Sequence, residues 1–108
     1  MKRFKDLKFE ESIFGGVGVA YTFKNGVTIS VQGSSRNYCT PKKDLMSAAE
    51  YSSFEVALWD EDGEWVTTKY IDESLYDVLG WQDRDEITAI MLNLQNTNLI
   101  KKENEKNG

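Results

Sequence analysis

The sequence predicts an α+β fold in which two antiparallel β-hairpins form a four- to five-stranded sheet that packs against one C-terminal amphipathic helix. Three observations support this prediction. Apolar and polar residues alternate on both sides of two glycine-containing turns, Asn25-Gly26 and Asp62-Gly63. The last third of the chain instead repeats its apolar residues at helical spacing. One helix laid over one sheet is the simplest two-layer arrangement for 108 residues.

The clearest hairpin covers residues 17–31 and turns around Asn25-Gly26. A two-residue loop would mix apolar and polar side chains on both faces of the hairpin. A three-residue loop, with Gly26 in the left-handed conformation, pairs Tyr21 with Ile29 and places every large apolar side chain on one face. We therefore expect the three-residue loop.

The same argument predicts a second hairpin over residues 54–70, with a three-residue loop that ends at Gly63. This register again gathers the apolar side chains on one face. An aromatic pair and an opposite-charge pair on the other face each add about 0.2–1 kcal/mol. The expected pairs are Leu58 with Val66, Trp59 with Trp65 and Glu55 with Lys69.

Two other segments adjoin these hairpins. Leu7 and Phe9 alternate with charged residues, which predicts a short edge strand before the first hairpin. Residues 33–53 show no convincing period, although 43–51 can form a helical turn or two. Compact domains seldom carry a structureless connection longer than about 12–15 residues unless it is functional. The loop at 33–53 is therefore a place to look for a binding site.

The C-terminal third predicts one amphipathic helix from about Arg84 to about Asn96. Asp83 and Glu86 have the spacing of a capping box at its start. The apolar stripe that follows lies on one face of a helix. It consists of Ile87, Ile90, Met91 and Leu94.

The expected organisation is a single domain over residues 1–100 and a disordered tail over 101–108, which contains no apolar residue except glycine. A short helix over 72–79 is also expected, because Gly80 is typical of a helix C-terminus. These expectations leave no room for a second core in a chain of this size.

Composition excludes several classes of function. The sequence contains no histidine, which excludes histidine-dependent catalytic dyads and histidine-ligated zinc, and its one cysteine, Cys39, excludes an internal disulfide. A net charge of −5 argues against binding to duplex nucleic acid. No segment is long and apolar enough to span a bilayer, and the N-terminus is too charged for a signal peptide. We expect a cytoplasmic protein that needs no cofactor or metal.

Arg36, Asn37 and Tyr38 form the first candidate ligand site. They lie in a loop rich in hydroxyl groups. A guanidinium binds phosphate bidentately, an amide reads a base or ribose edge, and a phenol ring stacks on a base. The alternative is a loop that satisfies its own backbone, with Tyr38 packed over the sheet edge.

Trp81 and Arg84 form the second candidate, at the start of the C-terminal helix. Free N–H groups and the positive end of the helix dipole favour an anion there, and the two side chains suit a ring and a phosphate. Two features oppose this hypothesis, because Asp83 can occupy the cap and the first turn is acidic. The alternative is that Trp81 anchors the loop in the core.

Trp59 and Trp65 are expected to share the face of the sheet that the helix does not cover. Two stacked tryptophans on that face indicate a covered surface, and an isologous dimer would cover it. The alternative is partial cover by the loop at 33–53. We therefore expect a homo-oligomer with Trp59 and Trp65 at its interface.

Five short motifs, in order and at similar spacing, resemble a set of small accessory proteins of tailed phages. The motifs are MKxFKDLxF (1–9), FxNGxxxSV (23–31), a Gly-x-x-Asn-Tyr-Cys segment (33–39, with one extra residue), EVA followed by DG (55–63), and V-x-G-W/Y…E…M (78–91). Proteins of this kind often antagonise host defence. The resemblance extends to the Thoeris anti-defence sponges, a group that sequesters cyclic ADP-ribose-type signals.

The resemblance implies a phage-encoded, non-enzymatic binding protein in the host cell cytoplasm that sequesters a cyclic nucleotide or a cyclic ADP-ribose-type signal. A sponge needs aromatic stacking and a few cationic groups but no nucleophile. The alternative is an acidic protein–protein inhibitor of a host nuclease or CRISPR effector, in which the acidic surface occupies a basic channel.

Overall fold

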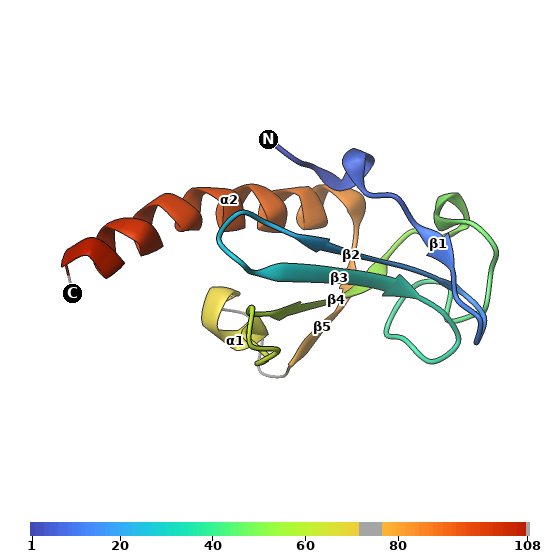
Figure 1. Cartoon of the computed structure of the whole chain (residues 1–108). Coiled ribbons are helices and arrows are strands. Elements are labelled where there is room, and N and C mark those ends of the chain that lie inside the picture. Colours follow the sequence, from blue (N-terminus) through green and yellow to red (C-terminus); the bar gives the residue numbers. More distant parts are fainter. Residues whose placement is uncertain (72–76, 108) are drawn as a thin grey trace.

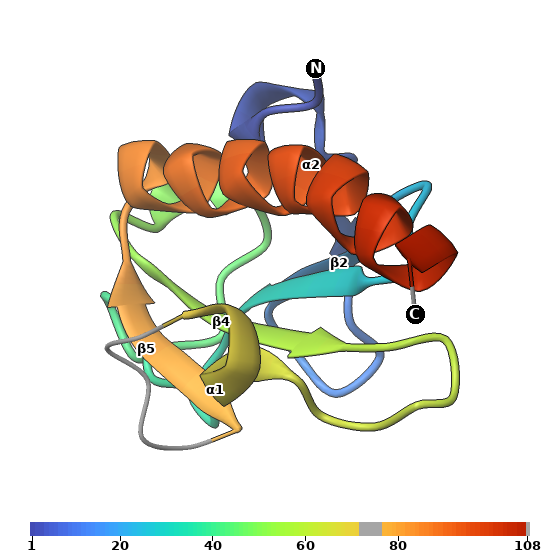
Figure 2. The same cartoon turned by 90° about the vertical axis from the view of Figure 1, so that its left-hand side faces the viewer.

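The structure is a computed structural model that describes residues 1–71 and 77–107, with side chains through residue 96. Five antiparallel strands form one sheet in the order β1-β2-β3-β4-β5, and α2 lies along one face of it (Figures 1 and 2). This arrangement confirms the predicted fold class. The elements are η1 (Phe4–Asp6), β1 (Glu10–Glu11), β2 (Val17–Thr22), β3 (Thr28–Gly33), η2 (Ala48–Glu50), β4 (Phe54–Trp59), α1 (Thr67–Tyr70), β5 (Val78–Gln82) and α2 (Arg84–Asn107).

The first hairpin has the predicted register. Tyr21 pairs with Ile29, and the Phe23 N–H donates to the Val27 carbonyl at 2.8 Å across a three-residue loop. Gly26 has φ +89°, a conformation in which glycine has no steric penalty. The burial of large apolar side chains on one face therefore selected the register, as the sequence indicated.

The second hairpin is confirmed only at its turn. Trp59 and Trp65 form the expected bridge, and the Val66 N–H donates to the Leu58 carbonyl at 2.9 Å. The predicted return strand beyond Val66 is wrong, because residues 67–70 form helix α1. The Thr67 hydroxyl accepts the Leu58 N–H at 2.9 Å, so a side chain replaces the next bond of the ladder.

Strand β5, rather than residues 66–70, completes the sheet next to β4. It pairs Leu79 with Val56 and Gln82 with Phe54, and a bulge separates the two pairs. The short helix expected over 72–79 is therefore wrong for residues 77–79, and its residues 72–76 lie outside the described part of the chain. The predicted Glu55–Lys69 pair is wrong as well, since Glu55 lies opposite Gln32 of β3.

Helix α2 starts with the predicted capping box. The Glu86 N–H donates to Asp83 at 2.8 Å and the Asp83 N–H donates to Glu86 at 3.0 Å. Its apolar stripe is confirmed, because Ile87, Met91 and Leu94 are buried against the sheet. The helical backbone continues past the predicted end to Asn107. Disorder of the tail in solution stays a prediction, and Gly108 lies outside the described residues.

The N-terminal segment and the long loop close the ends of the core. The predicted edge strand exists, but it is β1 at Glu10–Glu11, and a 3-10 turn precedes it. The loop at 33–53 folds around buried Tyr51, whose hydroxyl donates to the Lys43 carbonyl at 2.6 Å and accepts the Leu45 N–H at 2.8 Å. No helix within the described residues has the length and apolar character needed to cross a membrane.

Candidate functional site

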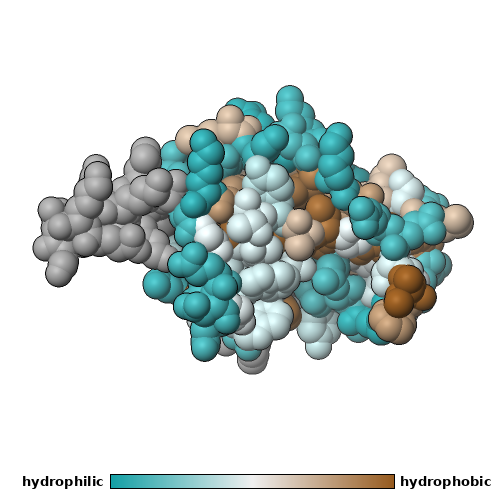
Figure 3. All heavy atoms as spheres, in the orientation of Figure 1, coloured by the Kyte–Doolittle hydropathy of each residue, from teal (hydrophilic) through white to brown (hydrophobic). Residues whose placement is uncertain are grey.

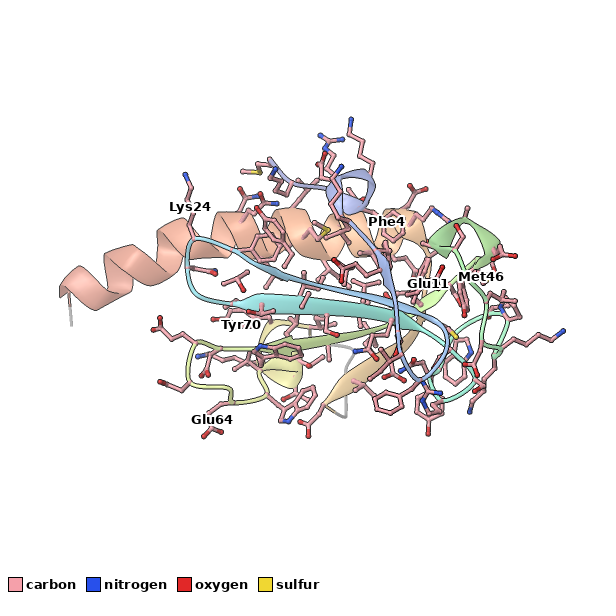
Figure 4. The ribbon with its side chains drawn as sticks, turned by 45° about the vertical axis from the view of Figure 1, so that its right-hand side comes forward. Phe4, Glu11, Lys24, Met46, Glu64 and Tyr70 are labelled. Atoms are coloured by element: carbon pink, nitrogen blue, oxygen red, sulfur yellow. The ribbon has the colours of Figure 1, made fainter. Side chains whose placement is uncertain are left out.

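The sheet face opposite α2 carries a groove of about 440 Å³. Cross-strand pairing places Ala20 opposite Ser30 and Ser30 opposite Ala57, while the large apolar neighbours of these residues face α2. Figure 4 shows Phe4 on the α2 side of the sheet and Glu64 on the other side. We call this surface the open face and its hollow the open-face groove.

Small residues form the floor of the open-face groove, and an aromatic side chain lies at one end. Gly18, Ala20 and Ser30 line its floor, and Trp59 lies at the Thr28 end of β3. The opposite end meets the loop that follows Gly33. The strand residues between the two ends span about 13 Å at roughly 3.3 Å per residue. The volume falls within the range of roughly 300–1,000 Å³ typical of small-molecule sites.

Charged and polar side chains form the other end and the β1 side of the groove. They are Lys8, Glu10, Glu11, Gln32, Arg36 and Asn37. Three residues selected from the sequence, Arg36, Asn37 and Trp59, therefore line the same hollow. The groove was not predicted, because it arises where β1, β2 and the loop after β3 meet.

Arg36 holds the turn between β1 and β2. Its guanidinium donates to the carbonyls of Phe14 (2.8 Å) and Gly15 (3.1 Å), and it lies 3.8 Å from the carboxylate of Asp44. The Asp44 carboxylate also accepts the Ser35 N–H at 2.8 Å, and this hydrogen bond is the largest cause of its lowered pKa. Arg36 thus connects the turn between β1 and β2 to the loop at 33–53, both at its own position and at Asp44.

Asn37 belongs to a hydrogen-bonded network across the open face. Its amide nitrogen donates to Glu55 (3.1 Å) and to Gln32 (3.3 Å), and its amide oxygen accepts the Ser34 hydroxyl at 2.6 Å. Gln32 in turn donates to the Ser30 hydroxyl at 3.2 Å. The network fixes the rim of the groove, and it uses both N–H groups of the Asn37 amide.

Glu55 is a site residue that sequence reasoning missed. Its carboxylate accepts the Asn37 amide and, at 2.8 Å, the Tyr38 N–H. It therefore orders the loop that carries the predicted ligand residues. The only sequence signal was its position on the face of the strand away from the core.

Tyr38 and Trp81 come together, although they were predicted in separate sites. Their ring centroids are 5.2 Å apart, the Trp81 N–H donates to the Tyr38 carbonyl at 2.9 Å, and Lys42 lies 4.9 Å from the Tyr38 ring. Trp81 is 59% exposed and does not anchor the loop in the core. Its φ of +55° is uncommon for a bulky residue.

Arg84 lies elsewhere, above the aromatic core. Its guanidinium carbon is 5.3 Å from the Phe4 ring centroid and 5.5 Å from that of Phe54. The same group donates to the Ala48 carbonyl at 3.0 Å. The structure thus separates Arg84 from Trp81 and places it between α2, η1 and η2.

Trp59 and Trp65 pack edge to face, with ring centroids 5.7 Å apart and an interplanar angle of 80°. Trp65 remains 51% exposed. Figure 3 shows that the side of the molecule in view is mostly hydrophilic, with some exposed apolar atoms toward the end that carries β1. Two exposed large apolar residues, Ile13 and Phe14, belong to the turn held by Arg36.

Cys39 is buried, and its thiol donates to the carbonyls of Ser34 and Pro41, each at 3.3 Å. Burial raises the pKa of this thiol, which lowers the thiolate fraction needed for nucleophilic attack. Within the described residues, no group of three or more cysteine, aspartate or glutamate side chains is arranged to hold a metal ion.

Comparisons of the chain with protein-family models, with curated proteins and with solved structures found no match. The interpretation of the open-face groove therefore rests on its own residues and their geometry.

Proposed function

We propose that this chain is a non-enzymatic binding protein that captures a nucleotide-derived signalling molecule in the open-face groove. One observation carries the proposal: a hollow of about 440 Å³ has a floor of small residues, Trp59 at one end and the fixed Asn37 network at the other. Such a floor lets a planar ring lie close to the sheet. Tryptophan stacks on any nucleobase, and polar groups at a fixed rim orient the bound molecule.

The side chains of the groove support binding more than catalysis. Histidine is absent from the sequence, and the one thiol is buried with a raised pKa. Glu10 and Glu11 line the groove, and in this proposal their carboxylates accept hydrogen bonds from the ligand. A protein that sequesters its ligand needs only affinity, which stacking and hydrogen bonds provide.

The biological setting in this proposal comes from the sequence resemblance. A small phage protein that binds a cyclic nucleotide or a cyclic ADP-ribose-type molecule would lower its free concentration in the host cytoplasm. Host immunity that depends on such a signal would then fail to start.

Titration calorimetry against cyclic mononucleotides, ADP-ribose and cyclic ADP-ribose tests the proposal. We expect heat with at least one compound, and Trp59→Ala should remove about 1–3 kcal/mol of its binding free energy through lost stacking. Trp81→Ala is the matched control, because Trp81 is exposed outside the groove. Loss of binding in Trp81→Ala alone would move the site to the Tyr38–Trp81 pair. The absence of heat with every compound would reject the proposal.

A homo-oligomer built on Trp59 and Trp65 remains part of the proposal. The exposed half of Trp65 is available to a second copy, and Trp59 packs directly against it. The double substitution Trp59→Glu, Trp65→Glu should then reduce the mass measured by light scattering. A wild-type protein that is monomeric at high micromolar concentration would contradict the oligomer.

A further inference from the structure

The fold already engages Arg36, one of the two cations that line the open-face groove among the described residues. Both outer nitrogens of Arg36 donate to backbone carbonyls, and Asp44 lies 3.8 Å away. Arg84, the other expected phosphate ligand, lies over Phe4 and Phe54 and does not line the groove. A phosphate in the groove would therefore compete with carbonyl and carboxylate oxygens for Arg36.

Carboxylates outnumber cations around the same hollow. Glu10 pairs with Gly18 and so shares the face on which the groove lies, whereas Glu11 pairs with the core residue Val17 and lines the groove only from the sheet edge. Glu55 lies behind Asn37 at the end of the groove. Against these, Lys8 is the one lining cation besides Arg36 among the described residues. The net charge of −5 adds repulsion of anions at longer range.

Part of the donor capacity of the rim is already used within the fold. The Asn37 amide nitrogen already donates to Glu55 and Gln32, and the Gln32 amide nitrogen donates to Ser30. The carboxylates of Glu10 and Glu11 accept and cannot donate when ionised. A ligand that donates from hydroxyl or amino groups finds acceptors at this rim, whereas each added phosphate charge meets the carboxylates of Glu10 and Glu11.

From these three observations we infer that the open-face groove selects ring-bearing ligands of low negative charge, such as nucleosides and cyclic mononucleotides, over linear polyphosphates. The inference rests on the proposed function and names the ligand class for the same site. Stacking on Trp59 supplies the affinity, and the acidic rim supplies the discrimination. A groove that clamped phosphate would instead prefer the more highly charged compounds.

Calorimetry with adenosine, 3′,5′-cyclic AMP, ADP and ATP at low and high salt tests the inference. We expect affinity to fall roughly threefold for each added negative charge, as for an exposed like-charge contact. Added salt should strengthen the binding of ADP and ATP, because it screens repulsion. Affinity that rises with charge, or polyphosphate binding that salt weakens, would overturn the inference and leave the proposed function intact.

Charge-neutralising variants show which carboxylates lower the affinity for highly charged ligands. Replacing Glu10 and Glu11 by glutamine should raise the affinity for ATP several-fold relative to the affinity for adenosine. The control replaces Glu61 and Glu64 by glutamine, which makes the same charge change in the turn at Gly63, outside the groove lining. Equal effects of the two double variants would overturn a local role for the rim. The absence of binding by all four compounds and by the ADP-ribose compounds would reject the proposed function itself.

Discussion

The two faces of the sheet have opposite chemistry, although the same strands build them. Toward α2, strands β3 and β4 present Ile29, Val56 and Leu58, all fully buried. Toward the open face, the alternate positions hold Ser30 and Ala57, small residues beside a groove. The difference shows that one face can supply the stability of the fold while the other is free to bind a ligand, since strand alternation separates the two sets of side chains.

The largest expected effect is on the α2 face. Phe54 is fully buried and lies within 6 Å, centroid to centroid, of the rings of Phe4, Phe9 and Tyr51. Phe54→Ala should lower the free energy of unfolding by about 3–5 kcal/mol through lost burial and a cavity, as measured by urea denaturation. Trp65→Ala on the other side of the sheet should cost about 1 kcal/mol or less, the worth of one aromatic pair. Similar losses in the two variants would contradict the division of roles.

The two predicted hairpins show what a sequence pattern can and cannot determine. In the first, alternation and Gly26 agree, and the register followed from burial alone. In the second, residues 67–70 have strand-like composition, yet they form a helical turn. The buried Thr67 hydroxyl accepts the Leu58 N–H in place of a backbone carbonyl. The strand at 78–82 pairs with β4 where the second half of the hairpin was expected. Such a competition between distant segments for one strand edge leaves no local pattern in the sequence.

Thr67 gives the next largest effect. Its hydroxyl accepts the buried Leu58 N–H and donates to the Asp77 carbonyl. Thr67→Val keeps the shape but leaves both backbone groups unpaired, which should cost about 1–3 kcal/mol of unfolding free energy. Thr67→Ser retains the hydroxyl and is the matched control. A stable Thr67→Val protein would mean that water replaces the hydroxyl at this position.

Of the five predicted ligand residues only Arg36 and Asn37 line the groove, so the sequence indicated part of the candidate site and not its arrangement. The polar loop after the first hairpin marked Arg36 and Asn37, and alternation marked Trp59. Their meeting in one groove depends on β1, which adds its own carboxylates, and on Glu55, which fixes the loop from a different strand. The contacts of β1 and of Glu55 join segments that are distant in the sequence. Residue type therefore indicated the chemistry of the site, while tertiary packing determined which polar groups remain available for a ligand.

Arg36 distinguishes a ligand contact from a structural one. If Arg36 bound a phosphate of the ligand, Arg36→Ala would weaken ligand binding ten- to a hundredfold and leave the melting temperature unchanged. The two carbonyl contacts instead predict a loss of about 1 kcal/mol of stability and faster amide exchange in the 12–16 turn, with a small effect on the affinity for adenosine. Arg36→Lys should show most of the same loss, because lysine lacks the planar fork. If Arg36→Ala loses ligand binding while amide exchange in the 12–16 turn stays unchanged, the result would support Arg36 as a phosphate ligand instead.

The smallest effect concerns Asp44 and appears only as a dependence on pH. The Ser35 N–H, and more weakly Arg36, hold the pKa of Asp44 below its ordinary 3.8 in the folded protein. A carboxylate with a lowered pKa stabilises the fold above its ordinary pKa, and this contribution is lost as the pH falls through the folded value. Wild type should therefore exceed Asp44→Asn in unfolding free energy near neutral pH, and the difference should shrink below pH 3.8.

Urea denaturation of both proteins over a pH series measures this difference, and Asp62→Asn, in the exposed turn at Gly63, controls for the change in net charge. Because Asp44 is exposed to solvent, added salt should reduce its interaction with Arg36 more than its hydrogen bond to Ser35, since screening acts on charges in water. A difference between wild type and Asp44→Asn that persists unchanged into acid would show that the side chain contributes through packing. In that case the loop at 33–53 would be held mainly by Tyr51 and Glu55, and the acidic rim of the groove would keep its shape at low pH.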